Sequence, residues 1–444
     1  MKKTLIRDGI VVNNGFKSQK DILIEGDIIT KVESNITPEP EMEIIESKGL
    51  FVLPGLIDDQ VHFREPGLTH KGNIRSESIS AIAGGITSYI EMPNTIPQTT
   101  SKKELDNKFK IASKNSAANY SFLFGGTNDN IDEILNLDKN QVAGIKLFLG
   151  SSTGNMLVDN PDTLKKIFRS TDLLIAVHCE DEETIKNNLE KYLHEFGEDI
   201  PVSKHPSIRS EDACYISSSK AISLAKETGA RLHVFHLSTG KETKLFSNAE
   251  LINKKITSEV CIHHLWFSDK DYKKKGAFIK WNPAIKSKSD QNELWKALND
   301  DRIDIIASDH APHTISEKNN SYLNSPSGGP LVQHSLLALL TAVKKGKISI
   351  EKLVQKACHN PAILFEISKR GFIKEGYFAD LVIINLDAKT KVTKKSLLYK
   401  CGWSPFEGIT FDAKIEKTFV NGIKVYENRK ILKTDAGRQL TFDR

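Results

Sequence analysis

The sequence predicts a closed barrel of alternating strands and helices, accompanied by a small β domain. Eight short apolar runs occupy the middle of the chain, and each ends in polar or small residues. Helix-like stretches separate most of these runs, a pattern typical of parallel sheets. Eight such repeats over roughly 250 residues match a (β/α)8 TIM-type barrel of the α/β class. The alternative, an open doubly wound sheet, is disfavoured because no Gly-rich dinucleotide-binding turn follows any of the runs.

The predicted elements follow from local periodicity. The predicted barrel strands are residues 52–61, 86–92, 120–125, 144–149, 173–177, 232–235, 256–262 and 303–307. The helical patterns between them include residues 103–112, 161–168, 211–227 and 290–298.

Both ends of the chain have a β pattern. Residues 1–54 contain short strands with turns, and a hairpin is predicted around the Asn421-Gly422 turn near the other end. Two terminal β segments that flank a long middle can pair with each other. We therefore expect residues 1–54 and 366–444 to form one small β-sandwich-like domain, and residues 55–365 to form the barrel.

The composition excludes several classes of protein. Hydrophobic residues at 39% and charged residues at 27% exclude a wholly disordered chain. The net charge of only +5 gives no reason to expect a nucleic-acid or membrane partner. No apolar run is long enough to span a bilayer, and Arg7 and Asp8 interrupt the apolar stretch of a secretory signal. Five scattered cysteines indicate no disulfide framework, so we expect a cytoplasmic protein.

Side chains with metal-binding or acid–base chemistry recur at the ends of the predicted barrel strands. They are His62, Lys146, His178, His236 and Asp309. The carboxyl ends of barrel strands meet on one face, so these distant residues are expected to converge. Imidazole nitrogen and carboxylate oxygen are the ligands expected for zinc or a similar divalent ion, with an open position for water. Each residue alone is more simply a hydrogen-bonded buried side chain or a helix cap, but their recurrence at one end favours a site.

Lys146 interrupts an otherwise apolar strand. Since side chains alternate along a strand, Lys146 is expected to point into the barrel, opposite to Ile145 and Leu147. A buried ammonium group must be paired, deprotonated or modified. A neutral amine near a metal can react with CO2 and become a carboxylate that bridges two ions. An ordinary buried salt bridge is the other interpretation, and the residues alone favour it.

Several motifs together resemble the signature of dihydroorotases in the amidohydrolase superfamily. The matching motifs are PGLIDDQVHFREPG (54–67), AGGIT (83–87), MPNT (92–95), HCE (178–180), HLST (236–239), EVCIHHL (259–265), NP (282–283) and ASDHAPH (307–313). They run in the family's order from about residue 50 to 365, and the two β ends suit the family's small β domain.

The resemblance implies a role for each matching residue. His62, His178 and His236 are the implied metal ligands, and Lys146 is the implied N6-carboxylated lysine that bridges two ions. Asp309 is implied to be both a ligand and the catalytic acid/base. The implied cofactor is Zn²⁺, with one or two ions per subunit. The implied substrate contacts are His62, Phe63, Arg64, Asn94, Asn282, His313, Ser327 and Gly328.

The implied reaction is the reversible hydrolysis of the cyclic amide of L-dihydroorotate to N-carbamoyl-L-aspartate, a step of pyrimidine (UMP) biosynthesis. The Arg64 guanidinium can bind the ring carboxylate, aided by the amides of Asn94 and Asn282. A metal-activated hydroxide attacks the ring carbonyl, and Asp309 delivers the proton to the leaving nitrogen. The expected partner is thus a small-molecule substrate, and the prediction allows a homodimer.

The sequence departs from the family pattern at Gln60, where the first motif normally has the first histidine of His-x-His. A glutamine offers an amide oxygen, which is a weaker ligand for zinc than imidazole nitrogen. Asp58 or Asp59 could compensate, although Asp58 more simply supports the ligands. Three interpretations follow: two metals with one unusual ligand, a single tightly bound metal, or an inactive relative kept for assembly. Activity is favoured because the remaining site residues are all present.

The nearest alternative functions are those of hydantoinase or dihydropyrimidinase and of allantoinase. Their substrates lack the orotate carboxylate, so the REPG segment (64–67) favours dihydroorotase. The interpretation of the chain as a catalytically inactive assembly partner rests on Gln60 alone. A nucleotide-binding α/β protein is disfavoured because the chain has no phosphate-cradling loop.

Other polar residues in the motifs are expected to support the site. His263 and His264 are predicted to pack beneath it, and His310 to lie at the entry to the next helix. His233 is predicted to face away from His236 on its strand and to be structural. The long segment 181–209 is predicted to shape or cover the mouth of the pocket.

Overall fold

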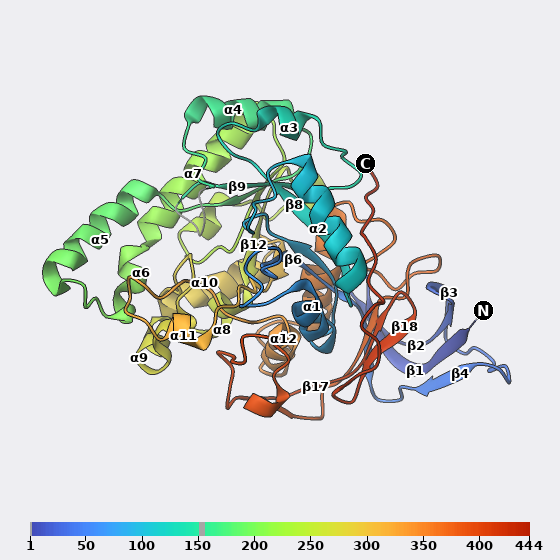
Figure 1. Ribbon diagram of the computed structural model, residues 1–444. Coiled ribbons are helices and arrows are strands. Elements are labelled where there is room, and N and C mark those ends of the chain that lie inside the picture. Colours follow the sequence, from blue (N-terminus) through green and yellow to red (C-terminus); the bar gives the residue numbers. More distant parts are fainter. Residues whose placement is uncertain (1, 151–155) are drawn as a thin grey trace.

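A closed barrel of eight parallel strands forms the centre of the molecule, which confirms the predicted fold (Figure 1). The computed structural model describes residues 2–150 and 156–444. The strands pair in chain order from β6 to β13. The barrel closes where the backbone amide of His62, after β6, donates to the carbonyl of His310, after β13, at 2.7 Å.

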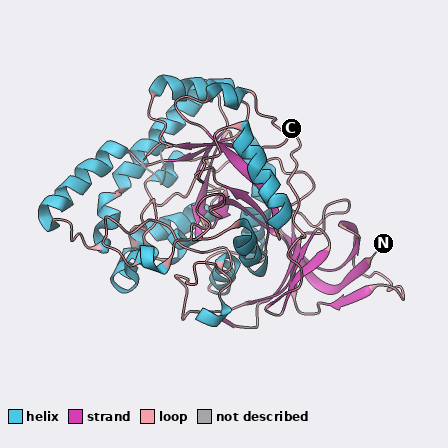
Figure 2. Cartoon of the chain, viewed as in Figure 1, coloured by secondary structure: helices cyan, strands magenta, loops and turns pink. Residues whose placement is uncertain are grey.

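The barrel strands are short, and helices surround them (Figure 2). The strands are β6 (Leu56–Val61), β7 (Ile86–Glu91), β8 (Asn119–Gly125), β9 (Gly144–Phe148), β10 (Ile175–His178), β11 (Leu232–Val234), β12 (Ile256–Cys261) and β13 (Ile305–Ala307). The helices are α1 (Ile74–Ala83), α2 (Lys102–Asn115), α3 (Ile131–Leu135), α4 (Pro161–Ser170), α5 (Glu182–Phe196), α6 (His205–Ile208), α7 (Glu211–Thr228), α8 (Ile262–Trp266), α9 (Tyr272–Lys275), α10 (Lys288–Asn299), α11 (Ile315–Lys318), α12 (Ser335–Lys344), α13 (Ile350–Val354) and α14 (Asn360–Leu364).

The helices begin and end where capping residues stand. The side chain of Ser210 accepts a hydrogen bond from the amide of Ala213 at the start of α7, and Gly229 ends that helix with φ 77°. The four predicted helices correspond to α2, α4, α7 and α10, each slightly longer than predicted. Within the described ranges, no helix has both the length and the apolar character needed to cross a membrane.

The two ends of the chain meet in a second sheet. Its strands are β1 (Lys3–Asn13), β2 (Phe16–Glu25), β3 (Ile28–Glu33), β4 (Glu43–Glu46), β5 (Phe51–Pro54), β14 (Leu381–Asn385), β17 (Lys414–Val420), β18 (Ile423–Glu427) and β19 (Lys430–Ile431). β5 pairs with β1 on one side and with β14 on the other. These nine strands form one continuous sheet, whereas we expected a sandwich-like arrangement. A separate pair consists of β15 (Thr390–Lys391) and β16 (Thr410–Phe411).

Gly55 separates the two sheets within the predicted strand 52–61. β5 ends at Pro54 and β6 begins at Leu56. A Cβ atom at Gly55 would lie 2.1 Å from Oγ1 of Thr87, so the chain can pass this close to β7 only with glycine. The pattern of a single apolar strand therefore contains the crossing from the terminal sheet into the barrel.

The last residues of the chain return to the barrel. Leu440 and Phe442 belong to the same buried cluster as Ile57 and Ile90 on the barrel strands. Arg444 donates hydrogen bonds to backbone carbonyls just before β9 (2.7 and 2.8 Å). The tail thus covers the amino-terminal end of the barrel, because its apolar side chains are buried there, rather than lying in the terminal β domain.

A buried polar network joins the terminal sheet to the barrel. Asp380, just before β14, forms an ion pair with Arg370 and accepts a hydrogen bond from Nδ2 of Asn119 (3.1 Å). Its other oxygen accepts from the backbone amide of Asn421 (2.8 Å). Arg370 and Asp380 are each only 4% exposed, so the pair is shielded from water.

Replacing Asp380 with alanine is expected to lower the free energy of unfolding by about 3–5 kcal/mol, because the buried Arg370 charge loses its partner. Urea unfolding followed by circular dichroism measures the change. Lys139→Ala is the matched control, because the Lys139–Asp172 pair is exposed and such pairs contribute about 0–1 kcal/mol. Equally small effects of both substitutions would contradict the role given to the network.

Candidate active site

A polar pocket lies at the carboxyl ends of the barrel strands. Its lining brings together residues that are far apart in the sequence. The lining residues that the sequence had singled out are Gln60, His62, Arg64, Asn94, Lys146, His178, His236, Asn282, Asp309, Ser327 and Gly328. The pocket therefore lies at the end of the barrel where the active sites of (β/α)8 enzymes are normally found.

His62 and Asp309 face each other across the closure of the barrel. Nε2 of His62 lies 3.4 Å from Oδ1 of Asp309, and Nδ1 of His62 lies 2.8 Å from Oδ1 of Asn94. Because the Asn94 oxygen accepts a hydrogen bond, Nδ1 carries the proton and the lone pair of Nε2 points towards Asp309. Burial lowers the pKa of His62 well below its usual value, so the ring is neutral.

His178 and His236 form a second facing pair. Nδ1 of His178 lies 3.0 Å from Nε2 of His236. On the other side of the ring, Nε2 of His178 lies 3.0 Å from the carboxylate of Glu180, which also pairs with Arg209. Burial opposes ionisation of Glu180, but Arg209 and His178 outweigh it and lower the pKa of the carboxyl to about 2. The ionised Glu180 thus lies beside Nε2 of His178, while Nδ1 forms a hydrogen bond with Nε2 of His236.

Lys146 lies in the barrel interior and is 1% exposed. Its Nζ lies 4.0 Å from the ring centre of Phe235 and 4.9 Å from that of Phe148. The salt bridge that the residues alone favoured is not formed with any described carboxylate, because the ammonium group faces aromatic rings. Burial lowers the pKa of Lys146 to about 7, against the opposing effects of Glu259 and Asp309. A large fraction of the amine is therefore neutral at pH 7.

Asp309 lies two residues after the eighth barrel strand, β13, in a strained backbone conformation with φ 49°. Its carboxyl group is buried, with 5% exposure of the residue. Burial raises the pKa of Asp309 to about 7, although Lys146, His178 and Arg64 act in the opposite direction. A carboxyl group with this pKa can both accept and release a proton near neutral pH.

Arg64 presents a cation to the pocket although the residue is only 4% exposed. Its Nε donates to the carbonyl of Pro312 (3.0 Å), and Nη2 lies 3.0 Å from Nε2 of His313. His313 lies behind Arg64, outside the pocket lining, and also contacts the carbonyl of Ser327 at 3.0 Å. The guanidinium is thus held in place along one edge, which leaves its other N–H groups for a ligand.

Gln60 lines the pocket, but its amide oxygen is engaged. Sγ of Cys261 donates to Oε1 of Gln60 at 3.4 Å. Asp58, the residue expected to support the ligands, accepts a hydrogen bond from the backbone amide of Ser308 (3.1 Å) beside β13. Asp58 therefore holds the strand that leads to Asp309 and does not line the pocket.

Phe63 was predicted to contact substrate, but its side chain is fully buried away from the pocket. Its ring centre lies 4.4 Å from that of Tyr89 and 5.6 Å from that of His310. Phe63 follows the end of β6 at Val61, and its ring enters the core between those of Tyr89 and His310.

Sequence reasoning missed two aromatic residues of the lining, Trp281 and Phe148. Trp281 stacks on His263, with ring centres 4.5 Å apart and an angle of 16° between the planes. Its carbonyl lies 2.6 Å from Nε2 of His205, in the segment 181–209 that was expected near the mouth. Trp281 directly precedes Asn282, a predicted substrate contact, and this neighbourhood could have indicated that Trp281 lines the pocket.

His233 was predicted to face away from His236 and to be structural, and its direction was predicted wrongly. His233 pairs in register with Ala176, which pairs with Lys146, so the three side chains face the same, interior side of the barrel. The strand ends before His236, which has φ 40°, and this turn breaks the alternation that we used.

The comparisons with known proteins agree with this geometry. The model of the amidohydrolase family matches residues 51–425. A dihydroorotase from Methanosarcina acetivorans is 34% identical over 413 residues, which cover 90% of this chain and 87% of the relative. A dihydroorotase from Lactococcus lactis is 34% identical over 440 residues, 95% of this chain and 99% of the relative.

Solved structures with other names share the fold. The L-hydantoinase (dihydropyrimidinase) from Arthrobacter aurescens superposes with a TM-score of 0.94 at 27% identity, over 99% of this chain and 100% of the other. The family model, the relatives and the shared fold each cover most of the chain. This protein therefore belongs to the amidohydrolase family.

Proposed function

We propose that this protein is a dihydroorotase, which interconverts L-dihydroorotate and N-carbamoyl-L-aspartate. The buried guanidinium of Arg64 beside the His62–Asp309 pair is the observation that carries the proposal, since dihydroorotate has a ring carboxylate that a guanidinium binds well. The relatives named dihydroorotase, at 32–34% identity in several archaea and bacteria, support the same substrate. Hydantoinase or dihydropyrimidinase activity is the second candidate, supported by the shared fold of the solved structures.

The amidohydrolase family implies a divalent metal cofactor, and the residues of the pocket fit one. Neutral His178 and His236 bring two nitrogens within 3.0 Å, and Nδ1 of His236 has no hydrogen-bond partner among the described residues. The lone pair of His62 likewise faces the carboxylate of Asp309. Imidazole nitrogen and carboxylate oxygen are the ligands that zinc takes in proteins. We propose Zn²⁺, one or two ions per subunit, held by His62, His178, His236, Asp309 and an N6-carboxylated Lys146.

The protein's own residues bind substrate and move the proton. Arg64 holds the ring carboxylate, and Asn282 and the Ser327–Gly328 loop also line the pocket. Asp309 accepts the proton of the attacking water and gives it to the ring nitrogen, for which its pKa of about 7 suits it. Asn94 fixes the His62 ring, and His313 fixes Arg64. A bound divalent ion supplies an acidified water and polarises the amide carbonyl.

Catalysis is favoured over an inactive assembly role, because each polar group of the pocket except Gln60 keeps the chemistry that the reaction needs. The proposal includes a cytoplasmic location, supported by five free, buried cysteines. Its proposed partner is the small-molecule substrate, and the proposal allows a homodimer.

Arg64→Gln is expected to lower kcat/KM for L-dihydroorotate about 10- to 100-fold, because a charged hydrogen bond to the ring carboxylate is lost. Steady-state assays measure this loss, and dihydrouracil, which lacks the carboxylate, is the matched control substrate. Turnover of dihydrouracil or hydantoin that exceeds dihydroorotate turnover in the wild type would favour the second candidate function.

The Lys146→Ala variant is expected to lose bound zinc, because a metal ligand is removed. Its rate of dihydroorotate turnover is expected to fall more than about 100-fold at the same time. Elemental analysis and dihydroorotate assays measure the two effects. Metal-stripped wild type reconstituted with bicarbonate should regain more activity than the same protein in CO2-free buffer. Full zinc content in the variant would contradict the ligand role of Lys146.

Gln60→His is expected to raise the zinc content towards two ions per chain, because it adds an imidazole nitrogen beside His62. Elemental analysis after dialysis against limiting zinc checks this, with Gln60→Asn as the control that adds no nitrogen ligand. An unchanged zinc content in Gln60→His would show that position 60 does not limit metal binding.

A further inference from the structure

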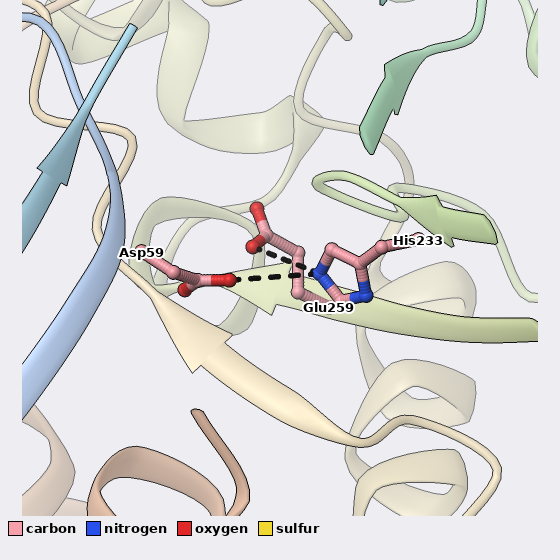
Figure 3. A group of neighbouring side chains, drawn as sticks. All are labelled: Asp59, His233 and Glu259. Carbon is pink, nitrogen blue, oxygen red and sulfur yellow. Dashed lines mark hydrogen bonds and ion pairs between the residues drawn. The ribbon is translucent and has the colours of Figure 1, made fainter. Parts of the chain in front are cut away.

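A second group of potential metal ligands lies inside the barrel, separate from the pocket. Asp59 on β6, His233 on β11 and Glu259 on β12 are all fully buried, with 0% exposure (Figure 3). Their ligand atoms lie within 4.8 Å of one another. In the described part of the chain, none of the three belongs to the lining of the pocket.

The hydrogen bonds of His233 direct a lone pair at the two carboxylates. The Thr257 hydroxyl donates to the carbonyl of Leu232 (3.2 Å), so its oxygen accepts from Nδ1 of His233 (2.8 Å). Nδ1 therefore carries the ring proton, and Nε2 is left with its lone pair. Nε2 lies 3.4 Å from Oε2 of Glu259 and 3.6 Å from Oδ2 of Asp59, as the dashed lines in Figure 3 mark.

Asp59 is buried without a donor. Neither of its carboxylate oxygens accepts a hydrogen bond from residues 2–150 or 156–444. Within the same ranges, no lysine or arginine lies within ion-pair distance of Asp59 or Glu259, and His233 is the side chain that contacts both. The charge of Lys146 acts on Glu259 without forming an ion pair. Burial lowers the pKa of His233 to about 4, so this ring does not supply a positive charge at neutral pH. Buried carboxylates are stable only with a cation or with bound protons.

We propose that Asp59, His233 and Glu259 bind a divalent transition-metal ion, with zinc as the test ion. Zinc ligands at about 2.0–2.2 Å in a tetrahedron lie about 3.3–3.6 Å apart, which is the spacing of Nε2 from the two carboxylate oxygens. Two carboxylates and one divalent ion are electrically neutral together, so the site suits the dry interior of the barrel. The Thr257 hydroxyl fixes the ring in the tautomer that a metal ligand needs.

The proposed ion would stabilise the turn that carries His236 into the candidate active site. Oε1 of Glu259 accepts a hydrogen bond from the backbone amide of His236 (3.2 Å), at the strained turn where His236 has φ 40°. A metal ion on Oε2 fixes the Glu259 side chain and therefore this turn. The site thus has a structural role for the pocket, and its existence does not depend on which cyclic amide the pocket takes.

The test counts zinc in a chain whose pocket ligands have been removed. In the background variant, His62, His178 and His236 are each replaced by asparagine. We expect this full-length variant to retain about one zinc ion per chain by native mass spectrometry and elemental analysis. Adding Asp59→Asn should remove that ion. Adding Glu242→Gln instead should leave it, because Glu242 is a buried carboxyl bonded to Ser218 and Thr239 elsewhere.

A second comparison applies if the background variant does not fold. Wild type and Asp59→Asn are then compared directly, and the substitution should lower the zinc content by about one ion per chain while the far-ultraviolet circular dichroism stays unchanged. Equal zinc contents in this pair, or a folded background variant free of zinc, would overturn the proposal. Protons shared by the two carboxyl groups would then be the occupant.

Discussion

Closure of the barrel between β6 and β13 is the constraint on which the candidate active site depends. The amide of His62 donates to the carbonyl of His310, and the Asp58 carboxylate accepts from the amide of Ser308. These bonds bring the start of the barrel sequence beside its end. Without them, Nε2 of His62 would not face Asp309. The metal ligands and the acid/base of the proposed mechanism therefore require the complete barrel.

The barrel interior contains polar groups at two depths, and the partners of each group explain its ionisation state. Near the mouth, Glu180 is ionised because Arg209 and His178 pair with it. Deeper in the barrel, Asp59 and Glu259 have only the neutral ring of His233 between them. At both depths, nitrogen or oxygen atoms of neighbouring side chains lie close together, and such an arrangement is stable when a cation or a proton lies between them. Lys146, against the ring of Phe235, lies in the same interior.

An irregularity in β6 separates three neighbouring polar residues. The register of β6 against β7 shifts between Asp58 and Val61. Asp58 reaches the backbone beside β13, Asp59 reaches His233 across the interior, and Gln60 lines the pocket. A regular strand would send alternate side chains to opposite faces. The local shift is what allows Asp59 and Gln60 both to occupy the inside of the barrel.

The linear pattern was sufficient for the barrel and for most of the pocket. Eight apolar runs separated by helical stretches, and polar residues after the strands, are local signals that arise from backbone geometry and burial. His178, His236 and Asp309 could therefore be expected on one face. The break at Gly55, the return of Leu440 to the barrel and the inward direction of His233 depend on contacts between distant segments, which no local pattern contains. The position of Asp59 beside His233 and Glu259 could not be predicted for the same reason, because these two residues lie on β11 and β12, far along the chain.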